Sequence, residues 1–271
     1  MFGNLGMPAL GVLGCGIASA ISMWLVFCFL SLYVYFDSRY KELNIFNRMT
    51  AFRLSVMQEI LKLGLPISVT VTAEAGLFSA VSIMIGTLGT NITGAHQIAL
   101  NVVTSMFMVP LAISSAITIK VGQSLGSNDI RAARLFGSTG ILICAVFMFL
   151  SACFLVMFRQ YVVDLYTSDI LIKEMAMSLL LVAAVFQIVD GIQIGAAGAL
   201  RGYKDTKIPM FINIVSYWVL AFPLSYLFGI IYKLPPNYIW CGFILGLSVA
   251  ACLLTWRFNH VSREHIISHH I

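Results

Sequence analysis

Two acidic residues, Glu74 and Asp190, each interrupt a long apolar segment of the chain. Glu74 stands in the stretch GLPISVTVTAEAG and Asp190 in the stretch VFQIVDGIQ. No lysine or arginine falls within the long apolar segments, so the sequence predicts no basic partner for either carboxylate. An unpaired carboxylate at mid-membrane depth costs at least about 2.5 to 3.5 kcal/mol. A bound proton, a bound cation or a water-filled cavity must therefore offset this cost.

The polar residues around Asp190 favour a cavity. Gln187, Asp190 and Gln193 recur at spacings of three, so they share one face of a helix. Small residues that allow another helix to approach closely follow on the same segment, namely Gly191, Gly195 and Gly198. Asp190 is thus expected to face a polar space between packed helices.

A second polar stripe begins at Gln97 and continues with Asn101, Thr104 and Ser105, at helical spacing. This pattern also fits side chains that only hydrogen-bond between helices, and that alternative stays open for Thr104 and Ser105. His96 is expected at the membrane interface. Two prolines predict kinks in their helices, Pro110 and Pro223.

These residues need membrane helices to position them. The chain has 271 residues, of which 60% are hydrophobic and 10% charged, whereas soluble domains have roughly 25% charged residues. Seven apolar segments are long enough to cross a bilayer. They cover residues 9–36, 64–88, 98–119, 137–158, 175–198, 208–231 and 238–256. The predicted fold class is therefore an all-α integral membrane protein, with the lipid bilayer as its surroundings.

The basic residues predict the orientation of the chain. Thirteen of the sixteen lysines and arginines lie in connections on one side of the predicted membrane. The basic side is cytoplasmic by the positive-inside rule, which places the N-terminus outside and the C-terminus inside. Although the net charge is +5, this distribution argues against a nucleic-acid partner.

The sequence offers no catalytic constellation. The six cysteines fall within the apolar segments, lack metal-ligand spacing and are interpreted as small packing residues. No combination of a nucleophile with a base is evident either. We therefore expect neither an enzyme nor a cofactor.

Two halves of a repeat are suggested by the first and last segments. GVLGCGIASAISMWLVFCFL and IWCGFILGLSVAACLLTWRF both begin with glycines, pass through small residues and end near Trp and Phe. Both run from outside to inside, as a parallel repeat requires. The connection 37–63 is the longest, and its part NRMTAFRLSVMQEILKLG has the spacing of an interfacial amphipathic helix.

Several motifs resemble the multidrug and toxic compound extrusion (MATE) transporters of the NorM type. They are the run GAHQIALNVVTSMFMVPLAISSAITIKVGQSLG and the loop GALRGYKDTKIPM. These motifs and the two acidic positions occur together in the order found in that family. The resemblance implies a bacterial inner-membrane protein of two six-helix lobes. Residues 1–36 would hold the last helix of the first lobe, 37–63 a cytoplasmic linker, 64–258 the second lobe and 259–271 a cytoplasmic tail. About five helices of the first lobe would be missing from this chain.

The resemblance also implies roles for individual residues. Glu74 and Asp190 match the acids that bind the coupling cation in relatives. This cation would be Na⁺ or H⁺, and Na⁺ is the only metal ion expected at the site. Phe186 stands where some sodium-coupled relatives have a tyrosine, so that position supplies no hydroxyl oxygen. The positions that contact cationic drugs in relatives are matched by Gln97, Asn101 and Asp169.

The function expected from these observations is export of small organic cations, such as dyes and cationic antibiotics, by cation antiport. One alternative is a lipid-linked oligosaccharide flippase of the same superfamily, although such a cavity should carry basic residues. A seven-helix receptor is a second alternative. Its retinal-binding form would need a lysine inside a segment, which this sequence lacks.

Overall fold

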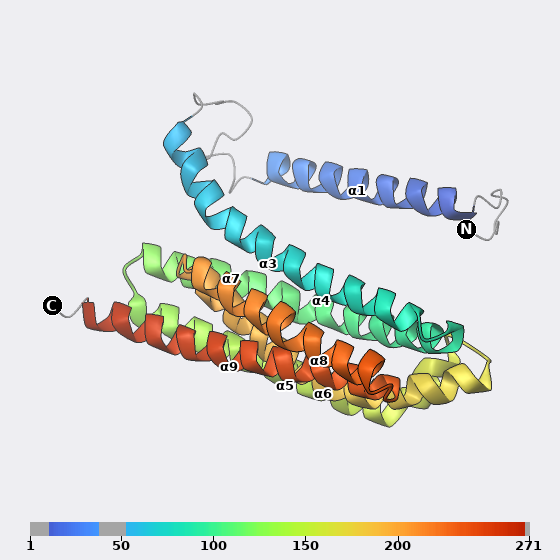
Figure 1. Ribbon diagram of the computed structural model, residues 1–271. Helices are drawn as coiled ribbons and strands as arrows, with labels where there is room; N and C mark the ends of the chain where they lie inside the picture. The colour runs from blue at the N-terminus through green and yellow to red at the C-terminus, as the bar shows by residue number, and fades with distance from the viewer. Residues whose placement is uncertain (1–10, 38–52, 269–271) are drawn as a thin grey trace. The chain divides into compact units, whose positions relative to one another are not determined.

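The computed structural model describes residues 11–37 and 53–268, and the regular structure in these ranges is entirely helical (Figure 1). The α-helices are α1 (Gly11–Phe36), α3 (Leu54–Gly86), α4 (Thr90–Gly126), α5 (Ile130–Asp164), α6 (Ile170–Gly202), α7 (Lys207–Ile214), α8 (Phe222–Tyr226) and α9 (Pro236–Ser268). Two π-helical segments flank α8, η1 (Val215–Ala221) and η2 (Leu227–Ile231). Seven helical stretches in the described ranges are long and apolar enough to cross a membrane, which confirms the predicted fold class.

The chain divides into two units, residues 1–56 and 57–271. The first unit contributes α1, whose described side chains are almost all exposed within that unit although the helix is strongly apolar. A helix that is apolar all round suits lipid or a protein partner better than water. The second unit holds the remaining membrane helices, which lie roughly side by side (Figure 1).

Helices α6 and α9 are the most deeply packed elements of the second unit. The predicted small residues lie where other helices approach it most closely. A Cβ atom on Gly191 would lie 3.0 Å from the carbonyl oxygen of Cys144 in α5, and one on Gly198 would lie 2.6 Å from the carbonyl oxygen of Ser114 in α4. Only glycine therefore allows α4 and α5 to pack this closely against α6.

Hydroxyl groups of α4 strengthen the same contact. Ser114 Oγ donates to the carbonyl of Ile194 over 2.7 Å, and Thr118 Oγ1 donates to the carbonyl of Gly198 over 2.8 Å. In a membrane interior a free hydroxyl has no water to bind, so these bonds both satisfy the donors and fix the register of α4 on α6. The helix that carries Asp190 is thereby held on two sides.

Several helices extend beyond the apolar segments from which they were predicted. Helices α3, α6 and α9 each contain 33 residues, a length of about 50 Å, whereas the hydrocarbon core is about 30 Å thick. Residues 54–63, predicted as part of the linker, form the first turns of α3. The predicted tail is helical up to Ser268. The predicted amphipathic helix begins outside the described residues, and from Leu54 onward it is continuous with α3.

The span Lys207–Ile231 is irregular around the predicted kink at Pro223. Its α-helical turns alternate with the π-helical segments η1 and η2. A π turn includes one extra residue and is frequently found at functional sites. Pro110 behaves differently, because α4 continues through it as one helix of 37 residues.

Candidate cation-binding site

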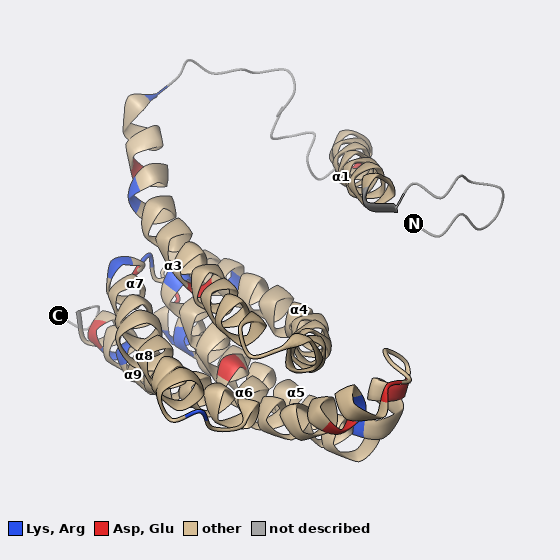
Figure 2. Ribbon diagram, turned by 45° about the vertical axis from the view of Figure 1, so that its right-hand side comes forward, with Lys and Arg blue, Asp and Glu red and all other residues tan. Residues whose placement is uncertain are grey.

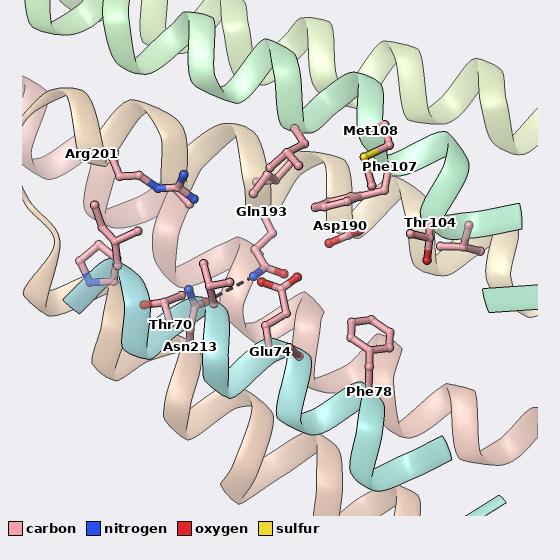
Figure 3. A pocket seen from close by; sticks show the side chains of 18 of the residues that line it. Thr70, Glu74, Phe78, Thr104, Phe107, Met108, Asp190, Gln193, Arg201 and Asn213 are labelled. Atoms are coloured by element: carbon pink, nitrogen blue, oxygen red, sulfur yellow. Dashed lines mark hydrogen bonds between the residues drawn. The ribbon is translucent and has the colours of Figure 1, made fainter. Parts of the chain in front are cut away.

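A cavity of about 500 Å³ opens between α3, α4, α6 and the Lys207–Ile231 span. Its wall is largely apolar, with aromatic, leucine, isoleucine and methionine side chains. The polar residues of the wall are Thr70, Glu74, Thr104, Asp190, Gln193, Arg201 and Asn213 (Figure 3), together with Asp205 and Thr206. This is the size and composition of a small-molecule site, in which a few polar groups orient a ligand held by apolar surface.

Glu74 and Asp190, singled out in the sequence, line this one cavity from two different helices. Asp190 is only 5% exposed, and Glu74 is half-buried. Within residues 11–37 and 53–268, neither carboxylate has an ion-pair partner. Most other charged positions lie toward the ends of the helices, whereas acidic turns on α3 and α6 remain inside the bundle (Figure 2).

Aromatic side chains hold α3 so that Glu74 faces the cavity. Trp218 Nε1 donates to the carbonyl of Ala73 over 3.1 Å, directly beside Glu74 in the chain. One turn beyond Glu74, the ring of Phe78 stacks on Phe243 with a centroid distance of 5.2 Å. These two contacts position the acidic turn of α3 against the Lys207–Ile231 span and α9.

Phe186 lies one turn before Asp190 and also lines the cavity. Its ring is 1% exposed and makes edge contacts with Phe78, Phe243 and Trp240. The predicted absence of a hydroxyl oxygen at this position therefore leaves an apolar, aromatic wall beside Asp190.

One basic residue, which lies beyond the predicted apolar segments, does reach the cavity. Helix α6 continues past the predicted end of its segment at Gly198, and its last turn carries Arg201. Eleven residues make three helical turns, so Arg201 lies on the same face as Asp190, about 16 Å further along the axis. The Arg201 side chain lines the same cavity (Figure 3). The hydropathy pattern hid this residue because a helix does not end where the membrane does.

Two residues of the Lys207–Ile231 span form a network that the sequence did not single out. Gln193 Nε2 donates to the hydroxyl oxygen of Tyr217 and to Asn213 Oδ1, the latter over 3.4 Å. Tyr217 is 1% exposed and Asn213 is 2% exposed. Their spacing of four residues in an apolar segment is the same kind of signal that identified the stripe at Gln97.

The three residues matched to drug contacts lie outside the wall of this cavity. Gln97 and Asn101 are exposed on α4, and Asn101 Oδ1 accepts a 2.8 Å hydrogen bond from the hydroxyl of Tyr166. Asp169 caps the N-terminus of α6 by accepting from the backbone N–H groups of Leu171 and Ile172. The structure thus gives Asn101 and Asp169 structural partners and does not bring them to Glu74.

The remaining members of the polar stripe have different surroundings. Thr104 lines the cavity. Ser105 Oγ donates to the carbonyl of Asn101 in its own helix over 2.8 Å. Only Thr104 of this pair is therefore available to a ligand in the cavity.

His96, predicted at the membrane interface, is buried within the protein. It is 1% exposed because α4 begins at Thr90 and turns this residue toward α9. Trp240 Nε1 donates to His96 Nδ1 over 3.2 Å, and His96 Nε2 lies 3.1 Å from Ser82 Oγ. Since Nδ1 accepts, the hydrogen of the neutral ring is on Nε2 and is donated to Ser82.

Long apolar helices around a cavity with two carboxylates that have no ion-pair partner among the described residues are typical of a multi-pass helical membrane protein. The family model described as MatE matches residues 66–227. A probable multidrug resistance protein NorM of Xanthomonas axonopodis pv. citri (strain 306) is 40% identical over 263 residues, and the multidrug resistance protein NorM of Vibrio vulnificus (strain YJ016) is 36% identical over 268 residues. This chain belongs to the MatE family, the MATE transporters.

Solved MATE structures share the fold. A crystal structure of the eukaryotic MATE transporter AtDTX14 matches with a TM-score of 0.84 at 22% identity, covering 97% of this chain and 60% of that one. An outward-facing multidrug resistance MATE family transporter of the MOP superfamily matches with a TM-score of 0.82 at 20% identity, covering 95% of this chain and 57% of that one. The two NorM matches each cover 97% of this chain, but only 57% of the Xanthomonas protein and 59% of the Vibrio protein.

Proposed function

We propose that this chain forms the cation-handling lobe of a multidrug efflux antiporter, which exports small organic cations while a coupling cation moves inward. The observation that carries this proposal is that Glu74 and Asp190 line one cavity and have no ion-pair partner among the described residues. Membership of the MATE family, and multidrug resistance in the names of its relatives, support transport over catalysis.

The coupling ion is Na⁺ or H⁺, held by Glu74 and Asp190 without a cofactor. Either ion removes the cost of two negative charges in a low-dielectric cavity. Binding therefore favours one arrangement of the lobes over another, since an ion shifts a conformational equilibrium by its difference in affinity for the two states. An organic cation in the same cavity competes for the same negative charge.

The cavity suits a cationic substrate rather than an anionic one. Its charged lining comprises Glu74, Asp190, Asp205 and Arg201, and because Asp205 is paired with Arg257, two acids remain against one base. The apolar wall receives the hydrocarbon part of a dye or drug, and the carboxylates attract its charge. This balance disfavours the flippase alternative, because a pyrophosphate-bearing substrate would meet mainly acids.

The full transport path requires a second lobe. We propose that α1 ends a first lobe, that residues 37–63 connect the lobes, and that residues 64–258 and the tail complete the second. Gln97, Asn101 and Asp169 would then contact the drug at a different point from Glu74. In a bacterial inner membrane the N-terminus of this chain would face outside and its C-terminus the cytoplasm.

The test is Asp190→Asn in the transporter that carries this chain with a first lobe. The change keeps the size of the side chain and removes its charge. Ion-driven efflux of a cationic dye should fail at normal expression level. Asp164→Asn, at a partly exposed acid paired with Lys173, is the matched control and should transport normally. Normal efflux by Asp190→Asn would overturn the proposal.

A further inference from the structure

Gln193 presents a buried oxygen atom without a partner to the cavity. Its side chain is 4% exposed and lines the cavity wall. Among the described residues, Oε1 has no hydrogen-bond partner. A buried acceptor left without a partner costs about 1 to 3 kcal/mol, so its position needs a reason.

The other end of the same amide is fixed. Nε2 donates to the hydroxyl oxygen of Tyr217 and to Asn213 Oδ1. Tyr217 and Asn213 both belong to the Lys207–Ile231 span and are almost fully buried. Because an amide is planar and its nitrogen is held on that side, its oxygen must point the other way.

That direction leads to Glu74. In Figure 3 the amide of Gln193 and the carboxylate of Glu74 point toward one another across the cavity, with Asp190 beside them. Carboxylate and amide oxygens both accept hydrogen bonds and repel each other when nothing lies between them. A cation placed among these oxygens removes the repulsion and satisfies the unpartnered acceptor.

We propose that Gln193 is a ligand of the coupling cation, which is sodium at this site. Its Oε1 supplies a neutral oxygen beside the two carboxylates, as hard cations prefer, while Asn213 and Tyr217 act as positioning residues. This oxygen takes the place of the hydroxyl that Phe186 does not provide. The inference rests on the proposed cation antiport and names a further member of its ion site.

Helix α6 contains a matched control in Gln187. This residue is 0% exposed, and neither of its amide atoms has a partner among the described residues. It lies on the same helix as Gln193, but it is not part of the cavity wall. Replacement by methionine preserves the shape of either glutamine and removes only its polar atoms.

The experiment measures sodium binding by the 271-residue chain in lipid nanodiscs, with calorimetry and ²³Na NMR. Gln193→Met should raise the sodium Kd at least tenfold, and Gln187→Met should leave it within twofold of the wild type. Asp190→Asn should abolish binding. Tyr217→Phe, which frees the amide nitrogen, should give a loss smaller than that of Gln193→Met, and circular dichroism checks that each variant is folded.

Each contrary result has a distinct meaning. Wild-type affinity in Gln193→Met, with binding lost in Asp190→Asn, would overturn the role of Gln193 and leave the carboxylate site standing. Equal weakening by Gln193→Met and Gln187→Met would assign both residues to packing and also overturn it. If the wild-type chain binds no sodium, the ligand role is overturned, and only proton-coupled antiport survives.

Discussion

Within the part of the chain that the structure describes, acids at one end of the second unit form ion pairs, whereas the two acids that line its cavity do not. Lys204 Nζ lies 2.7 Å from Glu59 Oε1, and Arg257 Nε lies 2.8 Å from Asp205 Oδ2, so the loop after α6 is tied to both α3 and α9. Glu74 and Asp190 have no comparable partner among the residues of the described ranges.

The difference shows which carboxylates the fold itself uses. The exposed pair of Lys204 with Glu59 costs little to form. The largely buried pair of Arg257 with Asp205 compensates its two charges within the pair. A carboxylate at mid-membrane depth needs compensation, and a permanent basic partner would supply it. Glu74 and Asp190 lack that partner in residues 11–37 and 53–268, so a mobile ligand can supply the compensation instead.

After Asp190→Asn, the largest effect is expected for Glu74→Gln. A unit charge about 4 Å from a bound cation contributes about 4 kcal/mol at an effective dielectric constant of about 20, which is roughly a thousandfold in affinity. Sodium or proton binding should fall accordingly, while the helical content stays unchanged. A loss smaller than threefold, measured by titration, would place the ion site elsewhere.

A smaller effect, on stability rather than on binding, is expected for Asp205→Asn. Its side chain is 15% exposed, and it is paired with Arg257, which is 23% exposed. Removing the charge leaves a largely buried guanidinium without its ion-pair partner, at a cost of about 1 to 3 kcal/mol. Thermal denaturation in detergent should show a lower midpoint, and an unchanged midpoint would mean that water already satisfies Arg257.

Arg201→Met should tighten cation binding. Position 201 lies about 16 Å further along the axis of α6 than Asp190, and a unit charge at such a distance repels a bound cation by about 1 kcal/mol at an effective dielectric constant of about 20. A roughly fivefold lower Kd for sodium is therefore expected, with Lys207→Met as the exposed control on the neighbouring helix. Weaker binding in Arg201→Met would instead make this arginine part of the site.

The smallest effect is expected for Glu59→Gln. Both members of its pair with Lys204 are more than half exposed, at 60% and 68%. Exposed pairs contribute at most about 1 kcal/mol and are screened by salt. Cation affinity should not change, and a measurable change would show that the loop after α6 is coupled to the cavity.

The sequence predicted the membrane helices and the two acids because both depend on residue type alone. Hydropathy locates a span, and a carboxylate in a span is conspicuous wherever its partners lie. The sequence did not predict that Arg201 lines the cavity, because helix α6 continues beyond its apolar segment. The roles of Tyr217 and Asn213 depend on which helices pack together and on the π turns of their span, and no local pattern specifies these.

The same limit applies to the polar stripe at Gln97. Its spacing correctly indicated a shared helix face, but the structure divides its members between the cavity, a bond to Tyr166 and a bond within the helix. His96 likewise became buried through its contact with Trp240, a residue far away in the sequence. Periodicity shows which residues are neighbours on one helix, whereas their partners on other helices follow from the tertiary fold.

Competition between drug and ion tests the central claim most directly. The binding of tetraphenylphosphonium, a small organic cation, would be measured at equilibrium over a series of sodium concentrations and, separately, of pH values. If both cations use Glu74 and Asp190, the apparent Kd of the drug should rise in proportion to the concentration of the coupling ion, and Asp190→Asn should remove this dependence. A drug affinity that is independent of both sodium and pH in the wild-type protein would contradict the account.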